Sequence, residues 1–199
     1  MSEARPKVII IAGPNGAGKS TLAPLLLRDK FDLSDYVNAD TLALGLSAFH
    51  PEKVAMQAGR VMLKRLRKLA SQRESFAFES TLASRSYAPW ISDLQSQGYT
   101  FHLLFLWVRS PDISVERVKE RVRLGGHDVP AETIRRRYHR GVRNFLEFYQ
   151  ELANTWVVYD NSFTGKPILI AEGVGAIIKQ LRQKDLWLRF CEARNDHTN

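Results

Sequence analysis

Short apolar runs recur along this chain and predict the strands of a buried sheet. The clearest of them lie at residues 7–12, 75–81, 100–108 and 156–161. Short, largely apolar runs of this kind are typical of parallel strands that are covered by helices. A weaker stretch at residues 31–37 adds a fifth strand, and residues 168–170 are a candidate for one more short strand.

Stretches with apolar residues at helical spacing separate these runs. They lie at residues 22–29, 50–70, 89–97 and 110–121. Within residues 50–70, for example, Ala58, Val61, Met62 and Leu69 fall on one side of a helix and the basic residues fall mainly on the other. A closing amphipathic helix is expected from residue 174 to residue 190. This alternation predicts a single α/β domain over residues 1–199, with a parallel sheet of about five strands and helices on both of its faces.

The segment directly after the first strand carries the clearest chemical signal. It fits the phosphate-binding loop pattern, which is a Gly, any four residues, and then Gly-Lys-Ser/Thr. Glycines let the backbone wrap around a triphosphate, and the N-terminus of the following helix adds N–H donors and its dipole. Lys19 is expected to reach the β- and γ-phosphates of ATP, and the Ser20 hydroxyl is expected to bind Mg²⁺. The alternative is a glycine-rich turn that binds nothing, and the strand before the loop and the helix after it argue against that. The expected ATP-binding residues of the loop are Gly13, Pro14, Asn15, Gly16, Ala17, Gly18, Lys19, Ser20 and Thr21.

Two carboxylates come at or just beyond the ends of predicted strands. Asp40 follows residues 31–37, and Glu79 stands near the end of residues 75–81. Ligands of open α/β sheets bind at the carboxyl ends of the strands, so both side chains are expected beside the phosphate loop. For Asp40 the spacing leaves an equal alternative, because Asp is also a good N-cap for the next helix. Glu79 is a candidate for Mg²⁺, through water, or for a substrate hydroxyl, and its alternative is an ion pair with Arg85 or another base.

Arginines crowd on both sides of a turn at residues 125–130, whose sequence is Gly-Gly-His-Asp-Val-Pro. They are Arg117, Arg121 and Arg123 before the turn, and Arg135, Arg136, Arg137 and Arg140 after it. A helical hairpin at about residues 112–145 would act as a lid, since guanidinium groups stay charged and form forked hydrogen bonds to phosphoryl groups. The alternatives are an RNA-binding hairpin or a solvated basic surface. Farther along the chain, Asn161 is expected to border the nucleotide base.

Composition and charge narrow the class of protein. The chain has 199 residues, of which 44% are hydrophobic and 25% are charged, and one cysteine, so it needs no disulfide to build a core. No signal peptide or apolar run near the ~20 residues of a membrane span is present, and we expect a cytoplasmic protein without membrane contact. The net charge of +8 admits nucleic acid as a partner. Nucleotide-dependent RNA binding is the less favoured alternative, because no aromatic residues are interleaved with the basic stretches.

The ordered set of motifs resembles the zeta toxin family of kinases, in its single-domain chromosomal form. The matching segments are Gly13–Thr21, Asn38–Asp40, Phe78–Leu82, Gly125–Pro130, Arg135–Tyr138 and Tyr159–Ser162. The phosphate loop alone is shared by many nucleotide enzymes. The Gly-Gly-His-Asp-Val-Pro block, together with its arginines and Glu79, is much more specific.

The resemblance implies an ATP- and Mg²⁺-dependent phosphotransferase with a fold like that of the nucleoside monophosphate kinases. It would transfer the γ-phosphate of ATP to a hydroxyl of a small molecule, and in the toxin members that molecule is UDP-N-acetylglucosamine. Asp40 falls where the family places its catalytic base. Lys19 and Arg121, with Arg136 or Arg137, would then supply the charge that stabilises the transferring phosphoryl group.

The resemblance says less about the acceptor. We assign Asp40, Glu79, Thr81 and Arg85 to acceptor binding, with Glu79 also near the metal. The acceptor-pocket residues that the best-known plasmid toxins carry between their third and fourth strands have no match here. A P-loop kinase for another small molecule, such as a sugar acid, a nucleoside or a drug, therefore remains the alternative. The family also suggests a small helical antitoxin as a partner.

Overall fold

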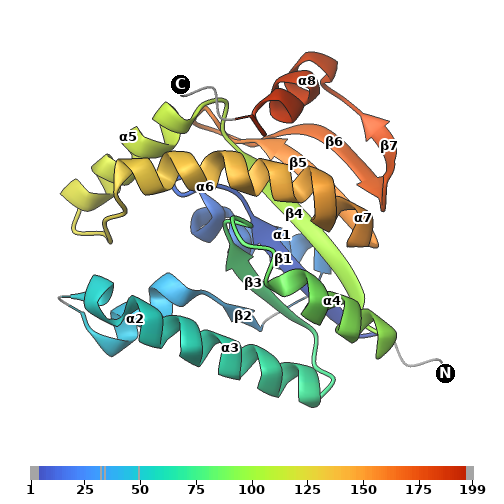
Figure 1. Cartoon of the computed structure of the whole chain (residues 1–199), viewed down its shortest axis with the longest axis horizontal. Coiled ribbons are helices and arrows are strands. Elements are labelled where there is room, and N and C mark those ends of the chain that lie inside the picture. Colours follow the sequence, from blue (N-terminus) through green and yellow to red (C-terminus); the bar gives the residue numbers. More distant parts are fainter. Residues whose placement is uncertain (1–4, 32, 34, 49, 196–199) are drawn as a thin grey trace.

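The predicted strands lie side by side in one seven-stranded sheet with the order β2-β3-β1-β4-β5-β6-β7 (Figure 1). The structure, a computed structural model, describes residues 5–31, 33, 35–48 and 50–195. The strands are β1 Lys7–Ala12, β2 Tyr36–Val37, β3 Phe76–Ser80, β4 Thr100–Trp107, β5 Thr155–Asp160, β6 Ile168–Val174 and β7 Ile177–Leu181. The helices are α1 Lys19–Phe31, α2 Ala39–Leu46, α3 Ala55–Ser71, α4 Tyr87–Ser96, α5 Pro111–Arg123, α6 Ala131–Asn144, α7 Gln150–Leu152 and α8 Lys184–Glu192. A 3-10 turn, η1 (Pro51–Val54), precedes α3, and a π-helical segment, η2 (Phe145–Tyr149), joins α6 to α7.

The five strands that the sequence predicts with most support form the parallel part of the sheet. β1 lies between β3 and β4, with Ile10 beside both Phe78 and Leu103. β2 and β5 extend this parallel block on its two sides. Every residue of β1 after Lys7 is fully buried, as expected for a strand with helices on both faces. The prediction of a P-loop α/β fold is therefore confirmed.

The end of the chain differs from the prediction. The sheet has seven strands rather than about five, because β6 and β7 add an antiparallel hairpin next to β5. The helix predicted for residues 174–190 is wrong in its first half. Val174, Ile177, Ile178 and Leu181 have helical spacing, but Gly175 turns the chain with a φ of 52° and the β-branched isoleucines then pair with β6. Only the second half is helical, as α8.

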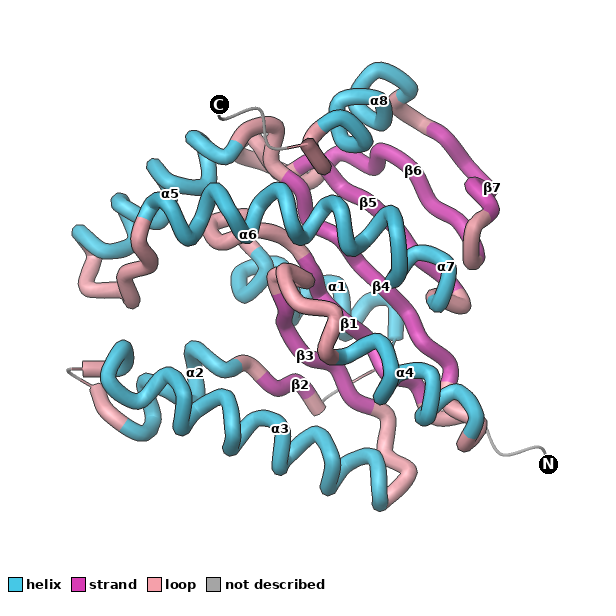
Figure 2. The backbone as a smooth tube through the Cα atoms, in the orientation of Figure 1, coloured by secondary structure: helices cyan, strands magenta, loops and turns pink. Residues whose placement is uncertain are grey.

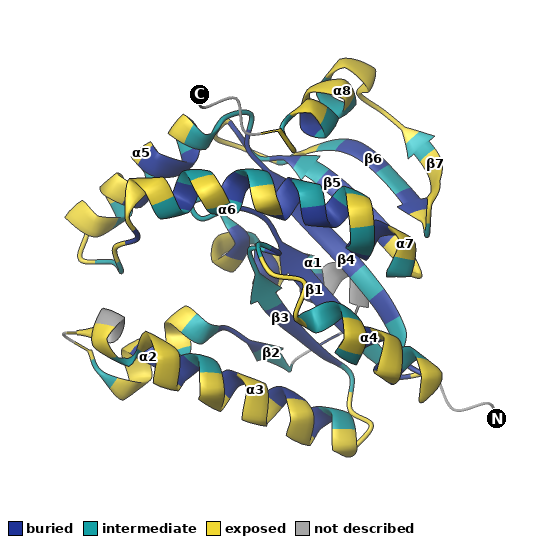
Figure 3. Cartoon of the chain, viewed as in Figure 1, coloured by how far each residue is buried: buried dark blue, intermediate teal, exposed yellow. Residues whose placement is uncertain are grey.

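The helices form a layer on each face of the sheet (Figures 1 and 2). The layer in front in Figure 1 contains α3, α4, α8 and the long helix that runs from α6 through η2 to α7. α1 lies behind the sheet, over β1 and β3. Burial follows this arrangement, with the central strands largely dark and with β7 and the outer faces of α3 and α8 exposed (Figure 3). In the described part of the chain, no helix combines the length and the apolar character that a membrane span requires.

The arginine-rich hairpin that the sequence suggests as a lid consists of α5 and most of α6. The inner face of α6 belongs to the main core through Tyr138, Val142 and the following Phe145, which are at most 1% exposed. A small separate cluster holds the outer part of the hairpin together, namely Val115, Val118, Val129 and Ile134. The hairpin is thus anchored to the main core at its base, and its outer part, which includes the turn at residues 123–130, packs in the separate cluster.

Candidate active site

The phosphate loop connects β1 to α1 at the carboxyl edge of the sheet. Gly16 has a φ of 75°, and a Cβ at this position would come within 2.8 Å of the Ser114 carbonyl oxygen in α5. A residue with a side chain would be strained there for both reasons. The loop therefore needs glycine in order to keep its turn while α5 packs directly against it.

Lys19 occupies the centre of this loop, and only 9% of it is exposed. Its Nζ donates hydrogen bonds of 2.9 Å to the carbonyl oxygens of Gly13 and Pro14. Burial lowers the pKa of Lys19, and the carboxylates of Glu79 and Asp40 oppose this shift in part. A buried ammonium group whose hydrogen bonds go to neutral carbonyl oxygens is well suited to receive an anion.

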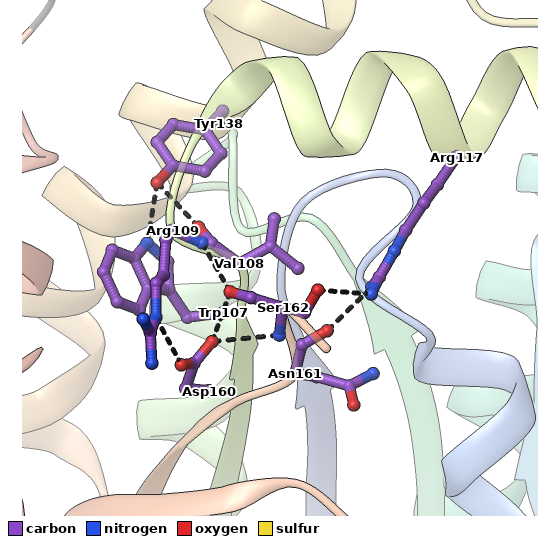
Figure 4. A network of polar contacts seen from close by, with 8 residues as sticks. All are labelled: Trp107, Val108, Arg109, Arg117, Tyr138, Asp160, Asn161 and Ser162. Atoms are coloured by element: carbon purple, nitrogen blue, oxygen red, sulfur yellow. Dashed lines mark hydrogen bonds and ion pairs between the residues drawn. The ribbon is translucent and has the colours of Figure 1, made fainter. Parts of the chain in front are cut away.

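The loop after β5 is bound by Arg117 of α5 (Figure 4), and hydrogen bonds join both of them to the phosphate loop. Asn161 Nδ2 donates to the Ala17 carbonyl oxygen over 2.8 Å. From α5, Arg117 donates to the carbonyl oxygens of Gly16, Asn161 and Ser162 over 3.3, 2.7 and 2.9 Å. One arginine thus fixes the phosphate loop, α5 and the loop after β5 relative to one another.

A buried network under this loop strengthens the connection (Figure 4). Asp160 accepts a 2.8 Å hydrogen bond from Arg109 Nε and a 2.9 Å hydrogen bond from the Ser162 backbone N–H. The Ser162 hydroxyl also donates to Asp160 and accepts from the Arg109 backbone N–H over 2.9 Å. The carboxylate of Asp160 is therefore fully paired although its side chain is 0% exposed.

Tyr138 fixes α6 to the same strand end. Its hydroxyl accepts a hydrogen bond from Trp107 Nε1 and donates one to the Val108 carbonyl oxygen, both over 2.8 Å. Burial raises the pKa of this phenol, so it stays protonated and keeps donating. The arginines of α6 therefore stand on a helix with a fixed position at the carboxyl edge of β4.

The contacts of Asn38 show whether Asp40 caps α2. Its Oδ1 accepts from the backbone N–H groups of Asp40 and Thr41 over 2.7 and 3.3 Å, so Asn38 is the N-cap of α2. The alternative in which Asp40 itself caps the helix is therefore wrong. Asn38 Nδ2 also donates to Ser20 Oγ over 3.1 Å. The amide thus joins the helix that carries Asp40 to the start of α1, and Asp40 faces the cavity.

Glu79 does not form the ion pair with Arg85 that the sequence left open. Glu79 accepts a hydrogen bond from the Tyr36 hydroxyl, and burial together with the Glu79 charge raises the pKa of Tyr36. Arg85 binds Asn144 Oδ1 over 3.0 Å and Glu147 over 3.4 Å instead, with its guanidinium carbon 3.7 Å from the centre of the Phe148 ring. The carboxylate of Glu79 therefore faces the cavity beside a neutral partner.

A cavity of about 480 Å³ joins these groups. Its lining includes ten residues that the sequence predicts for the site. Six belong to the phosphate loop, and the others are Asp40, Glu79, Arg121 and Asn161. Arg121 Nη2 donates to the His127 carbonyl oxygen over 2.6 Å, whereas its buried Nε has no hydrogen-bond partner among the described residues. The Gly-Gly-His turn therefore holds Arg121 at the cavity wall with one donor left unused.

Other predicted residues lie outside the lining. Thr81 and Arg85 belong to the segment between β3 and α4, and neither lines the cavity. Arg137 is half-buried and near enough to lower the pKa of Lys19, whereas Arg136 is exposed on α6. The structure thus brings together the donor half and the two carboxylates more closely than the rest of the predicted acceptor half.

Sequence reasoning missed several residues of the site. Arg117 was one of many arginines in the hairpin, and only the structure shows that it binds backbone carbonyl oxygens. Tyr36 and Arg109 stood at strand ends without a motif of their own. Asn38 lies in the matching segment Asn38–Asp40, but the sequence assigns no role to it. The loop Phe163–Gly165 directly follows the matching segment Tyr159–Ser162, and that adjacency was the available signal.

Comparisons with known proteins agree with this geometry. An uncharacterised protein of Haemophilus influenzae is 27% identical over 132 residues, which cover 66% of this chain and 92% of that protein. The AvrRxo1-ORF1:-ORF2 complex with ATP has a TM-score of 0.75 at 15% identity, covering 99% of this chain and 67% of its own. For the PezAT chromosomal toxin–antitoxin system of Streptococcus pneumoniae the TM-score is 0.61 at 15% identity, with coverages of 86% and 73%. At these identities, the two structures show a shared fold.

The strongest comparison is with a protein family. Residues 1–166, which contain the phosphate loop, both carboxylates and the arginine-rich hairpin, match the family model for zeta toxins. The matched segment ends just before β6, so the antiparallel hairpin and α8 lie beyond it. Because the match covers most of the sequence and all of the cavity lining, this chain belongs to the zeta toxin family.

Proposed function

We propose that this protein is an ATP-dependent kinase that transfers the γ-phosphate to a hydroxyl of a small molecule. The observation that carries the proposal is the shared cavity, in which Lys19 and Ser20 of the phosphate loop lie with Asp40 and Glu79. Nucleotide hydrolases also place carboxylates beside the phosphates, and the match to the zeta toxin family favours transfer to an acceptor hydroxyl over transfer to water. A kinase needs a group that orients and deprotonates the acceptor hydroxyl.

The donor half binds the phosphates of ATP. The N–H groups of the loop and the N-terminus of α1 receive the phosphate oxygens, and Lys19 leaves its two carbonyl partners to contact them. Bound phosphates place negative charge beside Lys19 and so favour its charged form, which burial disfavours. These groups position the γ-phosphate at the mouth of the loop, next to the acceptor side of the cavity.

Magnesium fits the residues present. Ser20 offers a hydroxyl oxygen and Glu79 a carboxylate, and both line the cavity. Mg²⁺ prefers oxygen ligands and usually binds one or two protein groups together with the nucleotide phosphates. Ser20 would hold it directly and Glu79 through water. When bound, the ion neutralises charge on the phosphate oxygens.

Asp40 is the proposed catalytic base. It stands in the first turn of α2, where Asn38 satisfies the free N–H groups and leaves the carboxylate of Asp40 available. Arg121 would neutralise charge on the transferring phosphoryl group with its unused donor, and Arg137 or Arg136 would add to it from α6. The tip of the hairpin at residues 123–130 is the part we expect to close over the site.

The identities of the acceptor and of the protein partner are inferred from relatives of this chain. UDP-N-acetylglucosamine is the acceptor that the zeta toxin family implies, and Thr81 and Arg85 would contact it only after a rearrangement of the segment between β3 and α4. The PezAT structure is a toxin–antitoxin system, which makes a small antitoxin a reasonable partner for this chain. We expect both molecules to meet the protein in the cytoplasm.

The proposal is tested by mass spectrometry of a metabolite extract incubated with the protein, ATP and Mg²⁺. One new species heavier by a phosphate identifies the acceptor, and purified UDP-N-acetylglucosamine serves as the first candidate. Asp40→Asn should abolish transfer while ATP still binds. Asp93→Asn, which changes an exposed aspartate of α4, is the matched control and should transfer normally. Transfer by Asp40→Asn at the normal rate would remove Asp40 as the base.

A further inference from the structure

The cavity wall contains an aromatic ring that the proposed reaction does not use. Phe163 lies three residues after the end of β5 and lines the cavity together with Thr164 and Gly165. Its exposed fraction is 63%, which is high for a large apolar residue in the wall of a polar cavity. An exposed ring in such a place is suited to bind a ligand.

A fixed cation supports this ring on one face. The guanidinium carbon of Arg109 lies 4.8 Å from the centre of the Phe163 ring. The side chain of Arg109 is held by the 2.8 Å ion pair with Asp160, whose side chain is fully buried. A buried carboxylate is costly unless it is paired, and here its partner is the cation under the ring. Because Arg109 covers one face and the ring stays largely exposed, the other face is open.

The position of the ring relative to the phosphate loop is also fixed. Asn161 and Ser162, the two residues before Phe163, are the ones that Arg117 binds through their carbonyl oxygens. Asn161 also donates to the Ala17 carbonyl oxygen inside the phosphate loop. A ligand whose phosphates occupy the loop therefore meets the ring at a constant distance and orientation.

We infer that Phe163 is a stacking platform for the nucleobase of a nucleoside triphosphate whose phosphates lie in the loop. The inference rests on the proposed function and adds to it the subsite that holds the base. Stacking accepts every base, because each has an aromatic face. The loop Phe163-Thr164-Gly165 contains no acid or amide side chain that could read a base edge. The contribution of Phe163 to binding should therefore be about the same for GTP as for ATP.

The test compares the binding of Mg-ATP with that of inorganic tripolyphosphate, which has the phosphates but no base. Titration calorimetry of the full chain gives both dissociation constants. Phe163→Ala should weaken ATP binding by about tenfold, the typical loss of one base–aromatic contact, and leave tripolyphosphate binding within twofold. Phe163→Trp keeps an aromatic surface and should bind ATP like the wild type. Leu188→Ala removes a side chain of similar exposure on α8 and should change neither constant.

The outcomes separate this inference from the proposed function. Wild-type ATP affinity in Phe163→Ala, or an equal loss of ATP and tripolyphosphate binding, would overturn the platform. A loss of ATP binding in Phe163→Ala without a similar loss of GTP binding would do the same, since stacking does not depend on the identity of the base. A wild-type protein that binds neither ATP nor tripolyphosphate would instead contradict the proposed function itself.

Discussion

Asn38 connects the two halves of the candidate active site through a single amide. Its carbonyl oxygen caps α2, the helix that carries Asp40, and its amide nitrogen donates to the Ser20 hydroxyl. Asn38 is 7% exposed, so little water is available to replace either contact. Because the two contacts come from different atoms, substitutions can separate the structural role of this residue from its role in orienting Ser20.

Asn38→Ser should keep the cap and lose the contact with Ser20, since serine is a good N-cap but its side chain is too short to reach across. We expect the free energy of unfolding to stay within about 0.5 kcal/mol and the rate of phosphate transfer to fall roughly 3- to 10-fold. Asn38→Ala should lose about 1 kcal/mol of stability in addition. Urea denaturation and transfer assays measure the two effects. A normal transfer rate in Asn38→Ser would show that Ser20 needs no help from Asn38.

The buried position of Lys19 predicts how ATP binding depends on pH. Burial lowers the pKa of Lys19 in the free protein, whereas bound phosphates favour the charged form. The dissociation constant should therefore be constant while free Lys19 is protonated and should rise once the pH exceeds its lowered pKa. Burial and Glu79 raise the pKa of Tyr36, so that phenol does not produce the same effect. Between pH 8 and about 10, Lys19→Arg should bind with a constant affinity, because arginine stays charged. Equal slopes for both proteins would contradict this assignment.

At the scale of elements, the long helix α6 holds the segment after β3 against the sheet. Gly141 lies on the inner face of α6, directly against the Thr81 carbonyl oxygen. Asn144 Nδ2 donates to the Leu82 carbonyl oxygen over 2.7 Å, and Leu82 has a φ of 52°, which is unusual for a branched apolar residue. These contacts keep the backbone at Leu82, just beyond Glu79, in an otherwise unfavourable conformation. The position of α6 and the conformation of the segment after Glu79 therefore depend on each other.

Gly141→Ala should therefore destabilise the protein although alanine favours helices. The added Cβ would lie too close to the Thr81 backbone carbonyl oxygen, and we expect a loss of about 1–3 kcal/mol in the free energy of unfolding. Gly59→Ala in α3 is the matched control, because its Cβ would meet nothing within 4 Å, and it should gain up to about 1 kcal/mol. Thermal and urea denaturation measure both. An equal increase in the free energy of unfolding of both variants would mean that α6 does not pack closely against Thr81.

At the scale of the whole molecule, the parallel block of the sheet was predictable, whereas only the start of β6, at residues 168–170, was predicted of its antiparallel edge. Strands β1, β3, β4 and β5 are short apolar runs bounded by polar residues, and burial on both faces leaves a clear pattern in the sequence. β7 is largely exposed, so no buried run marks it, and its apolar residues happen to fit a helical period. The turn at Gly175 makes this segment a strand and not a helix, and a glycine in the sequence does not show by itself which of the two follows.

The site shows the same division between local and distant information. The phosphate loop was located from its own motif, and Asp40 was placed at the cavity from its position just after a predicted strand. Arg85 was assigned to the acceptor from its place after Glu79, but its partners are Asn144 and Glu147, about 60 residues farther along the chain. The sequence does not predict the role of Arg117, because its partners also lie far away in the sequence. Its contacts with residues 16, 161 and 162 depend on how α5 packs, which no local pattern encodes.

His102 makes the stability of the whole fold depend on pH near neutrality. It lies in β4, where its ring contacts the Thr155 and Thr100 hydroxyl oxygens over 2.7 and 3.0 Å. Burial, and to a lesser extent the charge of Lys7, lowers the pKa of His102 below 6.5. The unfolded chain then binds a proton that the folded chain does not, so stability must fall as the pH decreases through about 6.5.

His102→Gln removes this proton while keeping a donor and an acceptor for the two threonines. Its free energy of unfolding should change less than that of the wild type between pH 8 and pH 5. Above pH 7.5, the pH dependence of this free energy should be nearly the same for both proteins. Urea denaturation at several pH values gives the two curves, and their difference isolates His102 from the other histidines. If the curves run parallel over the whole range, His102 has the same pKa in the folded and unfolded chains, and burial in β4 carries no cost for its charged form.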